Sequence, residues 1–343
     1  MERLVPEDNT PSMPLNDAHL EGLFFLCRMS KIAYNKTPLS FTDQLALLQS
    51  RGLTINDHAK AISYLQEISY YRLSAYFLPY QQTKDKFNSG ITFEQIIDTY
   101  SFDRALRLLV FDCIERIEVA IRTQIIYSMA IHYNDSHWQD NKNLFITPYY
   151  NKIGNLIDPY SDLQTIISKA KTARTPEVFI KHYIDNYNTP SNPPSWMCFE
   201  LLTIGELSHI YRGIKDNADR KRVADFFDLH PTVFTSWIHT LTYVRNICAH
   251  HSRLWNKDLA IEPDKLLKPV GNWISKPFEN NKRVFYFLCL LKYLLLRSNP
   301  ENGLKDKLEE LFRKHPNIPI QFMGIPSDGK GNMLAWQKEP IWK

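Results

Sequence analysis

Apolar side chains recur at every third or fourth position along most of this 343-residue chain, which is the period of an amphipathic α-helix. The longest such run extends from Ile91 to Tyr127 without a glycine or a proline. It predicts one long helix, or two abutting helices, with Thr92 as the N-cap and Gln95 as its capping partner. Patterns that alternate polar and apolar residues, as strands do, are scarce. The chain is therefore predicted to be an all-α helical bundle.

Two stretches depart from this helical period. Residues 1–33 have few periodic apolar positions, and we predict a loosely ordered N-terminal lead-in there. Residues from about 132 to 194 contain several turn signals and a proline-rich end, which predicts a less regular, loop-rich insertion. Residues 34–343 are expected to form one all-α domain around that insertion.

The most apolar run, from Val284 to Leu296, bears on membrane attachment. It contains Lys292 and is well short of the roughly 20 apolar residues needed to span a bilayer, so it predicts a buried helix. No targeting segment stands out near the N-terminus. We therefore expect a cytoplasmic protein without a membrane partner.

Composition narrows the functions that the chain can have. The formal net charge is only +4, so any nucleic-acid-binding surface must be a local patch rather than a basic tail. The five cysteines are scattered, and no pair has metal-ligand spacing. This pattern predicts reduced thiols, no metal site and no other cofactor.

The densest group of polar side chains lies between Arg245 and Arg253, in a helix predicted at about 232–256. At about 100° per residue, Asn246, His250 and Arg253 share one stripe of that helix, and Arg245 lies to one side. A neutral imidazole can take and return a proton near neutral pH, and a guanidinium fits phosphate oxygens. An asparagine one turn away can orient the imidazole or bond a sugar hydroxyl. These groups together suffice to cleave RNA without a metal.

The string from Arg245 to Asn256, RNICAHHSRLWN, resembles the AbiD/AbiF-type branch of the Abi-like proteins of bacterial phage abortive infection. Its Arg-Asn-x-x-x-His core is similar to the Arg-x4–6-His signature of the HEPN superfamily. The resemblance begins near Tyr34 and continues to the C-terminus. Its other landmarks are YYRLSAYFLPY at 70–80, FDRALR at 102–107, the elements PSWM and GELS between 194 and 208, and FMGIP at 322–326.

The resemblance implies a HEPN-like helical bundle with additional helices, and a toxin-like, metal-independent endoribonuclease. It implies cleavage of RNA to 2′,3′-cyclic phosphate and 5′-hydroxyl ends. Arg245, Asn246 and His250 are the implied catalytic residues. His251 and Arg253 are secondary catalytic residues or phosphate contacts, because His251 also satisfies the signature but points away from the Asn246 stripe.

Two further clusters are candidates for supporting the site or for binding RNA. On the long helix, a Glu-x-x-Glu-x-x-x-Arg pattern can support the Arg–His pair, and ordinary surface ion pairing is the alternative explanation. Near the start of the chain, tyrosines and an arginine can form an aromatic, cationic face for RNA, or can simply close a core. The candidates are Glu115, Glu118, Arg122, Arg104, Arg107, Tyr71, Arg72 and Tyr76.

The partners follow from the proposed chemistry and from the resemblance. One helix supplies one Arg–His pair, whereas a general acid and a general base on opposite sides of the scissile bond need two. Because the HEPN family pairs two copies, we predict a homodimer with a shared cleft. The resemblance also implies a small noncoding RNA that restrains the toxin as its antitoxin. The alternative function is a non-catalytic RNA-binding module that holds such a structured RNA.

Overall fold

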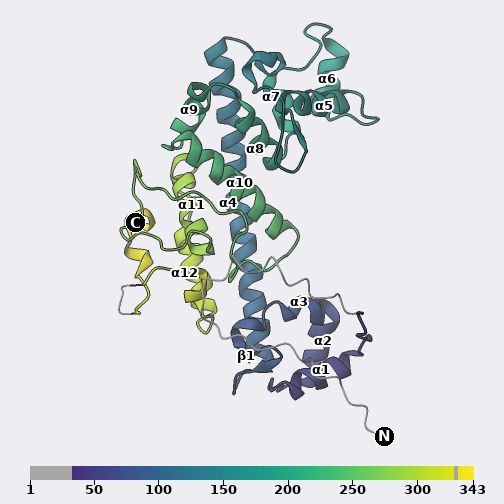
Figure 1. Ribbon diagram of the computed structural model, residues 1–343, viewed down its shortest axis with the longest axis vertical. Helices are drawn as coiled ribbons and strands as arrows, with labels where there is room; N and C mark the ends of the chain where they lie inside the picture. Colours follow the sequence, from purple (N-terminus) through teal and green to yellow (C-terminus); the bar gives the residue numbers. More distant parts are fainter. Residues whose placement is uncertain (1–32, 328–330) are drawn as a thin grey trace.

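Helices dominate the computed structural model, which describes residues 33–327 and 331–343 (Figure 1). The all-α prediction is confirmed. The strands in these ranges form two short antiparallel pairs, β1 (Gln81–Thr83) with β2 (Lys86–Phe87) and β3 (Tyr149–Tyr150) with β4 (Leu156–Ile157). The predicted lead-in at 1–33 lies outside the described residues except for Ala33.

One helix, α4 (Phe93–Tyr133), runs through most of the length of the molecule and organises it (Figure 1). Nothing interrupts its 41 residues, so the long apolar-periodic run forms a single helix of about 60 Å. Thr92 and Gln95 form the predicted capping box at its start. Asn134 ends it in the left-handed conformation, with φ of 48°.

The other helices pack around α4. Near its N-terminal end lie α1 (Phe41–Ser50), α2 (His58–Ile68) and α3 (Tyr70–Ser74), as Figure 1 shows. Its other contacts come mostly from the C-terminal half of the chain, chiefly from α9, α10, α11 and α12. The bounds in that half are α7 (Ser195–Cys198), α8 (Ile204–Gly213), α9 (Asn217–Asp225), α10 (Pro231–Ala249), α11 (Val284–Ser298) and α12 (Leu304–Lys314).

The insertion predicted at about 132–194 is more regular than its sequence suggested. Helix α4 continues to Tyr133, and the segment after it contains the β3–β4 hairpin and two helices, α5 (Pro159–Lys171) and α6 (Val178–Asn186). Short 3-10 turns complete the described chain: η1 (Leu78–Tyr80), η2 (Trp138–Asp140), η3 (Lys142–Leu144), η4 (Phe199–Leu201), η5 (Ile320–Met323), η6 (Trp336–Lys338) and η7 (Pro340–Trp342).

The core lies where α4 meets α10 and α11. Phe102, Leu106 and Val110 of α4 are fully buried at the helical spacing that the sequence predicted. Each such side chain stabilises the fold by about 1.5–3 kcal/mol through the apolar surface that it removes from water. Every residue of α11 from Val284 to Leu295 is buried, as predicted for this apolar run. Across the described ranges, no helix combines the length and the apolar character needed to cross a bilayer.

The predicted end of the motif helix, at about 256, is wrong, because α10 ends at Ala249. His250 is the C-cap, and His251 takes a left-handed conformation with φ of 56°. The Ser252 amide donates to the Ile247 carbonyl at 2.9 Å, which closes the helix end. The chain then turns away from the axis of α10.

Candidate functional site

The turn after α10 sets the directions of the motif side chains. Because His251 is left-handed, Arg253 does not continue the stripe of Asn246 and His250, and the prediction of one shared stripe is wrong for Arg253. Both imidazoles, of His250 and His251, are exposed. The turn therefore presents two adjacent histidines to solvent at the end of a rigid helix.

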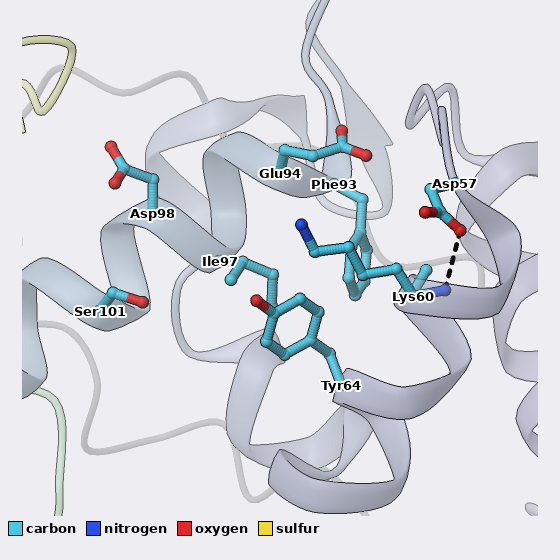
Figure 2. Close-up of a pocket in the computed structure, with 9 residues that line it drawn as sticks. Asp57, Lys60, Tyr64, Phe93, Glu94, Ile97, Asp98 and Ser101 are labelled. Atoms are coloured by element: carbon cyan, nitrogen blue, oxygen red, sulfur yellow. Dashed lines mark hydrogen bonds between the residues drawn. The ribbon is translucent and has the colours of Figure 1, made fainter.

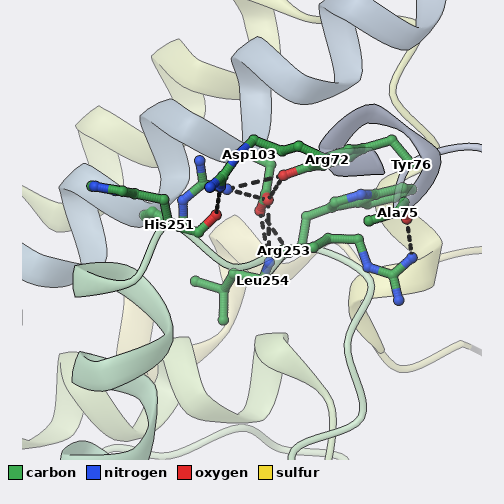
Figure 3. Close-up of polar contacts among 9 residues, drawn as sticks. Arg72, Ala75, Tyr76, Asp103, His251, Arg253 and Leu254 are labelled. Atoms are coloured by element: carbon green, nitrogen blue, oxygen red, sulfur yellow. Dashed lines mark hydrogen bonds and ion pairs between the residues drawn. The ribbon is translucent and has the colours of Figure 1, made fainter. Parts of the chain in front are cut away.

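A buried carboxylate on α4 anchors this turn (Figure 3). Asp103 is 0% exposed and accepts hydrogen bonds from the Leu254 amide at 3.1 Å and the Trp255 amide at 2.7 Å. The Tyr76 hydroxyl donates to the same carboxylate at 2.7 Å, and Arg107 forms an ion pair with it. Burial is the largest influence on the Asp103 pKa and raises it, whereas Arg107, Tyr76 and the two amides lower it. One side chain thus joins α4, the segment just after α3 and the motif turn.

Two arginines tie the turn to α3 in opposite directions. Arg72 Nη1 donates to the carbonyl oxygen of His251 at 2.8 Å, and Arg253 Nη1 donates to the carbonyl oxygen of Ala75. Figure 3 shows both side chains reaching between the two segments. Each guanidinium has five N–H donors, so these bonds leave donors for a ligand.

A cleft of about 490 Å³ opens between α3 and the motif turn. Its lining includes both imidazoles, His250 and His251, and three cationic side chains, Arg72, Arg253 and Lys257. Tyr71 stands at the cleft with 88% of its surface exposed, so its ring is accessible for stacking. The cleft therefore brings together proton-transfer groups, positive charge and an aromatic face.

Two of the candidates for supporting the site or for binding RNA are buried and support the site. Tyr76 is 1% exposed and Arg107 is 4% exposed, and both bind Asp103. Arg107 Nη1 also donates to the Tyr76 hydroxyl at 3.1 Å. Because both polar ends are committed inside the core, Tyr76 and Arg107 have the supporting role, which was the stated alternative to RNA binding for these residues.

Arg245 and Asn246 lie outside the cleft of their own chain. Arg245 is half-buried on α10, its Nη1 lies 3.3 Å from Asn246 Oδ1, and neither residue lines the cleft. The charge of Arg245 acts instead on Glu118 of α4. Burial raises the pKa of Glu118, and the positive charges of Arg122 and Arg245 partly offset that rise. Within one chain, the two ends of the Arg–His motif therefore face different surroundings.

The predicted Glu-x-x-Glu-x-x-x-Arg cluster divides into two parts. Arg122 Nη2 donates to Glu118 Oε1 at 3.0 Å and to the Leu202 carbonyl oxygen at 2.9 Å, so these two residues join α4 to the segment before α8. Glu115 and Arg104 are exposed on α4 and form no hydrogen bond or ion pair with any described residue. Glu118 is the glutamate placed to support Arg245.

A second cavity, of about 250 Å³, lies between α2 and the first turns of α4 (Figure 2). Three carboxylates, Asp57, Glu94 and Asp98, line it together with a single cation, Lys60. Asp98 Oδ1 also lies 2.6 Å from His315 Nδ1. Negative charge of this kind repels phosphate, so the cleft beside His250 is the better candidate for a nucleic acid.

Sequence reasoning missed two residues of the site, Asp103 and Lys257. Asp103 carried a signal, since it falls on the buried stripe of α4 together with Leu106 and Val110. A charged residue at such a position must be paired within the core. Lys257 follows the motif string and carried no comparable signal.

Comparison with known proteins places these elements in one family. Residues 63–256, more than half of the 343-residue chain, match the sequence model of a family described as Abi-like protein. The matched range contains α3, α4, α10 and the anchored turn. No curated protein and no solved structure matches the chain.

Proposed function

Because the chain belongs to the Abi-like protein family, we propose that it acts in phage abortive infection as a toxin-like endoribonuclease that cleaves RNA in the cleft between α3 and the motif turn. One observation carries the proposal: two exposed imidazoles, His250 and His251, share a single cleft with the guanidinium groups of Arg72 and Arg253. Guanidinium groups attract and orient phosphates, and imidazoles transfer protons near neutral pH. The likeness of the Arg245–His250 pair to the HEPN signature supports the same reaction.

The proposed reaction needs only these side chains and the RNA. His250, as general base, takes the proton of a ribose 2′-hydroxyl, and the 2′-oxygen attacks the adjacent phosphorus. The bond from phosphorus to the 5′-oxygen breaks, and an imidazolium returns a proton to that oxygen. The products carry a 2′,3′-cyclic phosphate and a 5′-hydroxyl, with no water or metal consumed. Positive charge at the cleft stabilises the phosphorane through which the reaction passes.

The acid has two candidate sources. His251 lines the same cleft as His250 and can donate the proton from within the chain. In a homodimer, which is part of the proposal, the imidazole of a second copy can donate it instead. If His251 is the acid, His251→Ala loses cleavage, whereas cleavage by His251→Ala near the wild-type rate assigns the acid to the second copy.

Cleavage of a labelled RNA by the full chain tests the assignment. We expect wild-type protein to cut it in the presence of a metal chelator, and His250→Ala to lose at least about 100-fold in rate. His182→Ala serves as the matched control, because His182 is an exposed histidine on α6, remote from the cleft. Replacing the 2′-hydroxyl with hydrogen at the cut position should block cleavage. If His250→Ala cuts at the wild-type rate, the assignment is wrong.

The alternative, a non-catalytic module that holds a structured small RNA, draws on the exposed ring of Tyr71 beside Arg72. Stacking and positive charge suffice for binding. Salt-dependent RNA binding by His250→Ala separates the two proposals. Retained affinity with lost cleavage supports the enzyme. RNA binding by wild-type protein without cleavage supports the module.

A further inference from the structure

One positive charge in the cleft between α3 and the motif turn has no partner within the chain. Arg72 and Arg253 each donate to a main-chain carbonyl oxygen across the cleft. Lys257 lines the same cleft and is half-buried, and its ammonium group forms no hydrogen bond or ion pair with any residue that the structure describes. An ammonium group has three N–H donors, so all three are available to a ligand.

The main chain is held on both sides of Lys257. Its amide donates to the Leu254 carbonyl oxygen at 3.1 Å. Arg283 Nη2 donates to Asn256 Oδ1 at 2.6 Å, and Arg283 Nη1 forms an ion pair with Asp258 Oδ1 at 2.9 Å. Asp258, the acidic residue next in sequence, is therefore paired with Arg283 rather than with Lys257. The lysine combines a fixed backbone with a free side chain.

The same anchored turn carries the proposed general base. His250 is the C-cap of α10, and the bonds to Asp103 hold the chain between it and Lys257. Both side chains line one cleft of about 490 Å³, which is within the size range of a site for a single small ligand. A phosphodiester bound in the cleft can therefore contact both. Arg245 does not line this cleft.

We infer that Lys257 contacts a non-bridging oxygen of the scissile phosphate and stabilises the phosphorane; this assignment rests on the proposed function. After His250 removes the proton of the 2′-hydroxyl, attack by the 2′-oxygen adds a second negative charge to the non-bridging oxygens. An ammonium group that contacts one of them stabilises the phosphorane more than the substrate, which accelerates the reaction. Lys257 stays protonated throughout, because the imidazoles make the proton transfers.

Three variants of the full chain test the role of the charge. Lys257→Met keeps the length of the side chain and removes the charge, so we expect the cleavage rate at saturating RNA to fall about 100-fold. Its midpoint of urea denaturation should match that of wild type, because the ammonium group has no partner in the described chain. Lys257→Arg keeps the charge and should retain at least about a tenth of the wild-type rate.

Lys169→Met is the matched control, because Lys169 is exposed on α5, remote from the cleft (Figure 1). It should cleave RNA at the wild-type rate. If Lys257→Met also cleaves at that rate, or if Lys257→Arg is as slow as Lys257→Met, the inference is wrong.

Sulfur in place of one non-bridging oxygen at the cut phosphate tests the contact itself. Sulfur is a weak hydrogen-bond acceptor, so the substitution weakens a bond from an ammonium group. For one of the two stereoisomers we expect wild type to slow more than Lys257→Met, because the variant has already lost the contact. A lysine that only supports the fold gives equal slowing in both proteins. Equal slowing with each stereoisomer therefore overturns the inference.

Binding without cleavage separates this inference from the proposed function. An RNA with a 2′-deoxyribose at the cut position has no attacking hydroxyl, so its affinity can be measured with wild type and with Lys257→Met. The slope of log affinity against log salt concentration should decrease in Lys257→Met by about one phosphate contact. If the slope decreases but wild type does not cleave ordinary RNA, the phosphate contact stands and the proposed function fails. An unchanged slope overturns the inference, and cleavage by wild type then leaves the proposed function standing.

Discussion

Two buried aspartates, one in α4 and one packed against it, lie toward opposite ends of that helix, and they differ in what they bind. Asp103, at the end near α3, is 0% exposed and accepts two main-chain amides from a turn 152 residues away in sequence. Asp219, on α9 at the other end, is 1% exposed and accepts the Tyr133 hydroxyl at 2.6 Å. Burial and the bond to Asp219 raise the pKa of Tyr133 to about 12. Both aspartates bind a tyrosine, but only Asp103 binds main chain.

The surroundings of the two carboxylates decide their roles. The cation beside Asp103 is Arg107, whose side chain is 5% exposed, so this pair is shielded from water. The basic side chains beside Asp219 are those of Arg222 and His132, which are 46% and 38% exposed and lie 3.6 Å and 3.8 Å from Asp219 Oδ1. Water can therefore replace the partners of Asp219 but not those of Asp103. The comparison shows that Asp103 positions the turn that lines the cleft, whereas Asp219 fastens α9 to the C-terminal end of α4.

The largest effect is expected from Asp103→Ala. The change leaves the buried Arg107 charge without its carboxylate and two buried amides without an acceptor, which costs about 3–5 kcal/mol of unfolding free energy. Urea denaturation of the full chain measures this loss. In Asp103→Asn one carboxylate oxygen is replaced by an amide nitrogen, which cannot accept from the Leu254 or Trp255 amide. Where this variant remains folded, we expect the rate of RNA cleavage to fall even though most of the unfolding free energy is kept. Wild-type stability in Asp103→Ala would contradict the anchoring role.

A smaller effect is expected from Asp219→Ala, the matched comparison at the other end of α4. The change removes the acceptor of the Tyr133 hydroxyl and costs about 1–3 kcal/mol. Because Asp219 does not touch the cleft, RNA cleavage by the folded variant should match that of wild type. A loss of cleavage in fully folded Asp219→Ala would show that the two ends of α4 are coupled and would break the contrast with Asp103.

Local rules predicted α4 and most of α10 because their causes lie within a few residues. The capping pair Thr92 and Gln95 and the apolar period mark where α4 starts and which face it buries. The turn after Ala249 has no comparable local cause. A left-handed residue at a helix end is usually a glycine, and here it is His251, so the usual signal for the end was missing. The sequence pattern therefore predicted that the motif helix continues to about Asn256, seven residues beyond its observed end at Ala249.

The site could be predicted by residue type but not by arrangement. His250, His251, Arg253, Arg72 and Tyr71 do meet at one cleft. What joins them is Asp103, and its bonds to Leu254 and Trp255 cross most of the matched range, so no periodicity reveals them. For the same reason the sequence left open whether Arg107 and Tyr76 support the site or bind RNA, and the structure shows both as buried partners of that carboxylate.

Arg72→Ala sharpens the comparison at the cleft itself. It removes the bond to the His251 carbonyl oxygen, and we expect a loss of about 1 kcal/mol in stability, well below that of Asp103→Ala. We also expect Arg72→Ala to bind RNA more weakly than wild type. The slope of log affinity against log salt concentration should decrease by the amount expected for the loss of about one phosphate contact. Arg72→Lys keeps the charge and is the control. Unchanged affinity in Arg72→Ala would place the RNA elsewhere.

The smallest effect concerns Glu118, which lies on α4 between the two aspartates. Its folded pKa is raised above that of the unfolded chain, so its favourable contribution is complete below the unfolded pKa and is lost as pH rises through the folded value. Glutamine does not ionise, so Glu118→Gln does not lose stability in this way as the pH rises. Its stability relative to wild type should therefore increase from pH 4 to pH 7, by less than about 1 kcal/mol in urea denaturation.

Removing the Arg245 charge removes an influence that lowers the Glu118 pKa, so the same comparison made in Arg245→Ala should show a larger increase. A relative stability that decreases with pH would mean that Arg122 and Arg245 outweigh burial and depress the pKa.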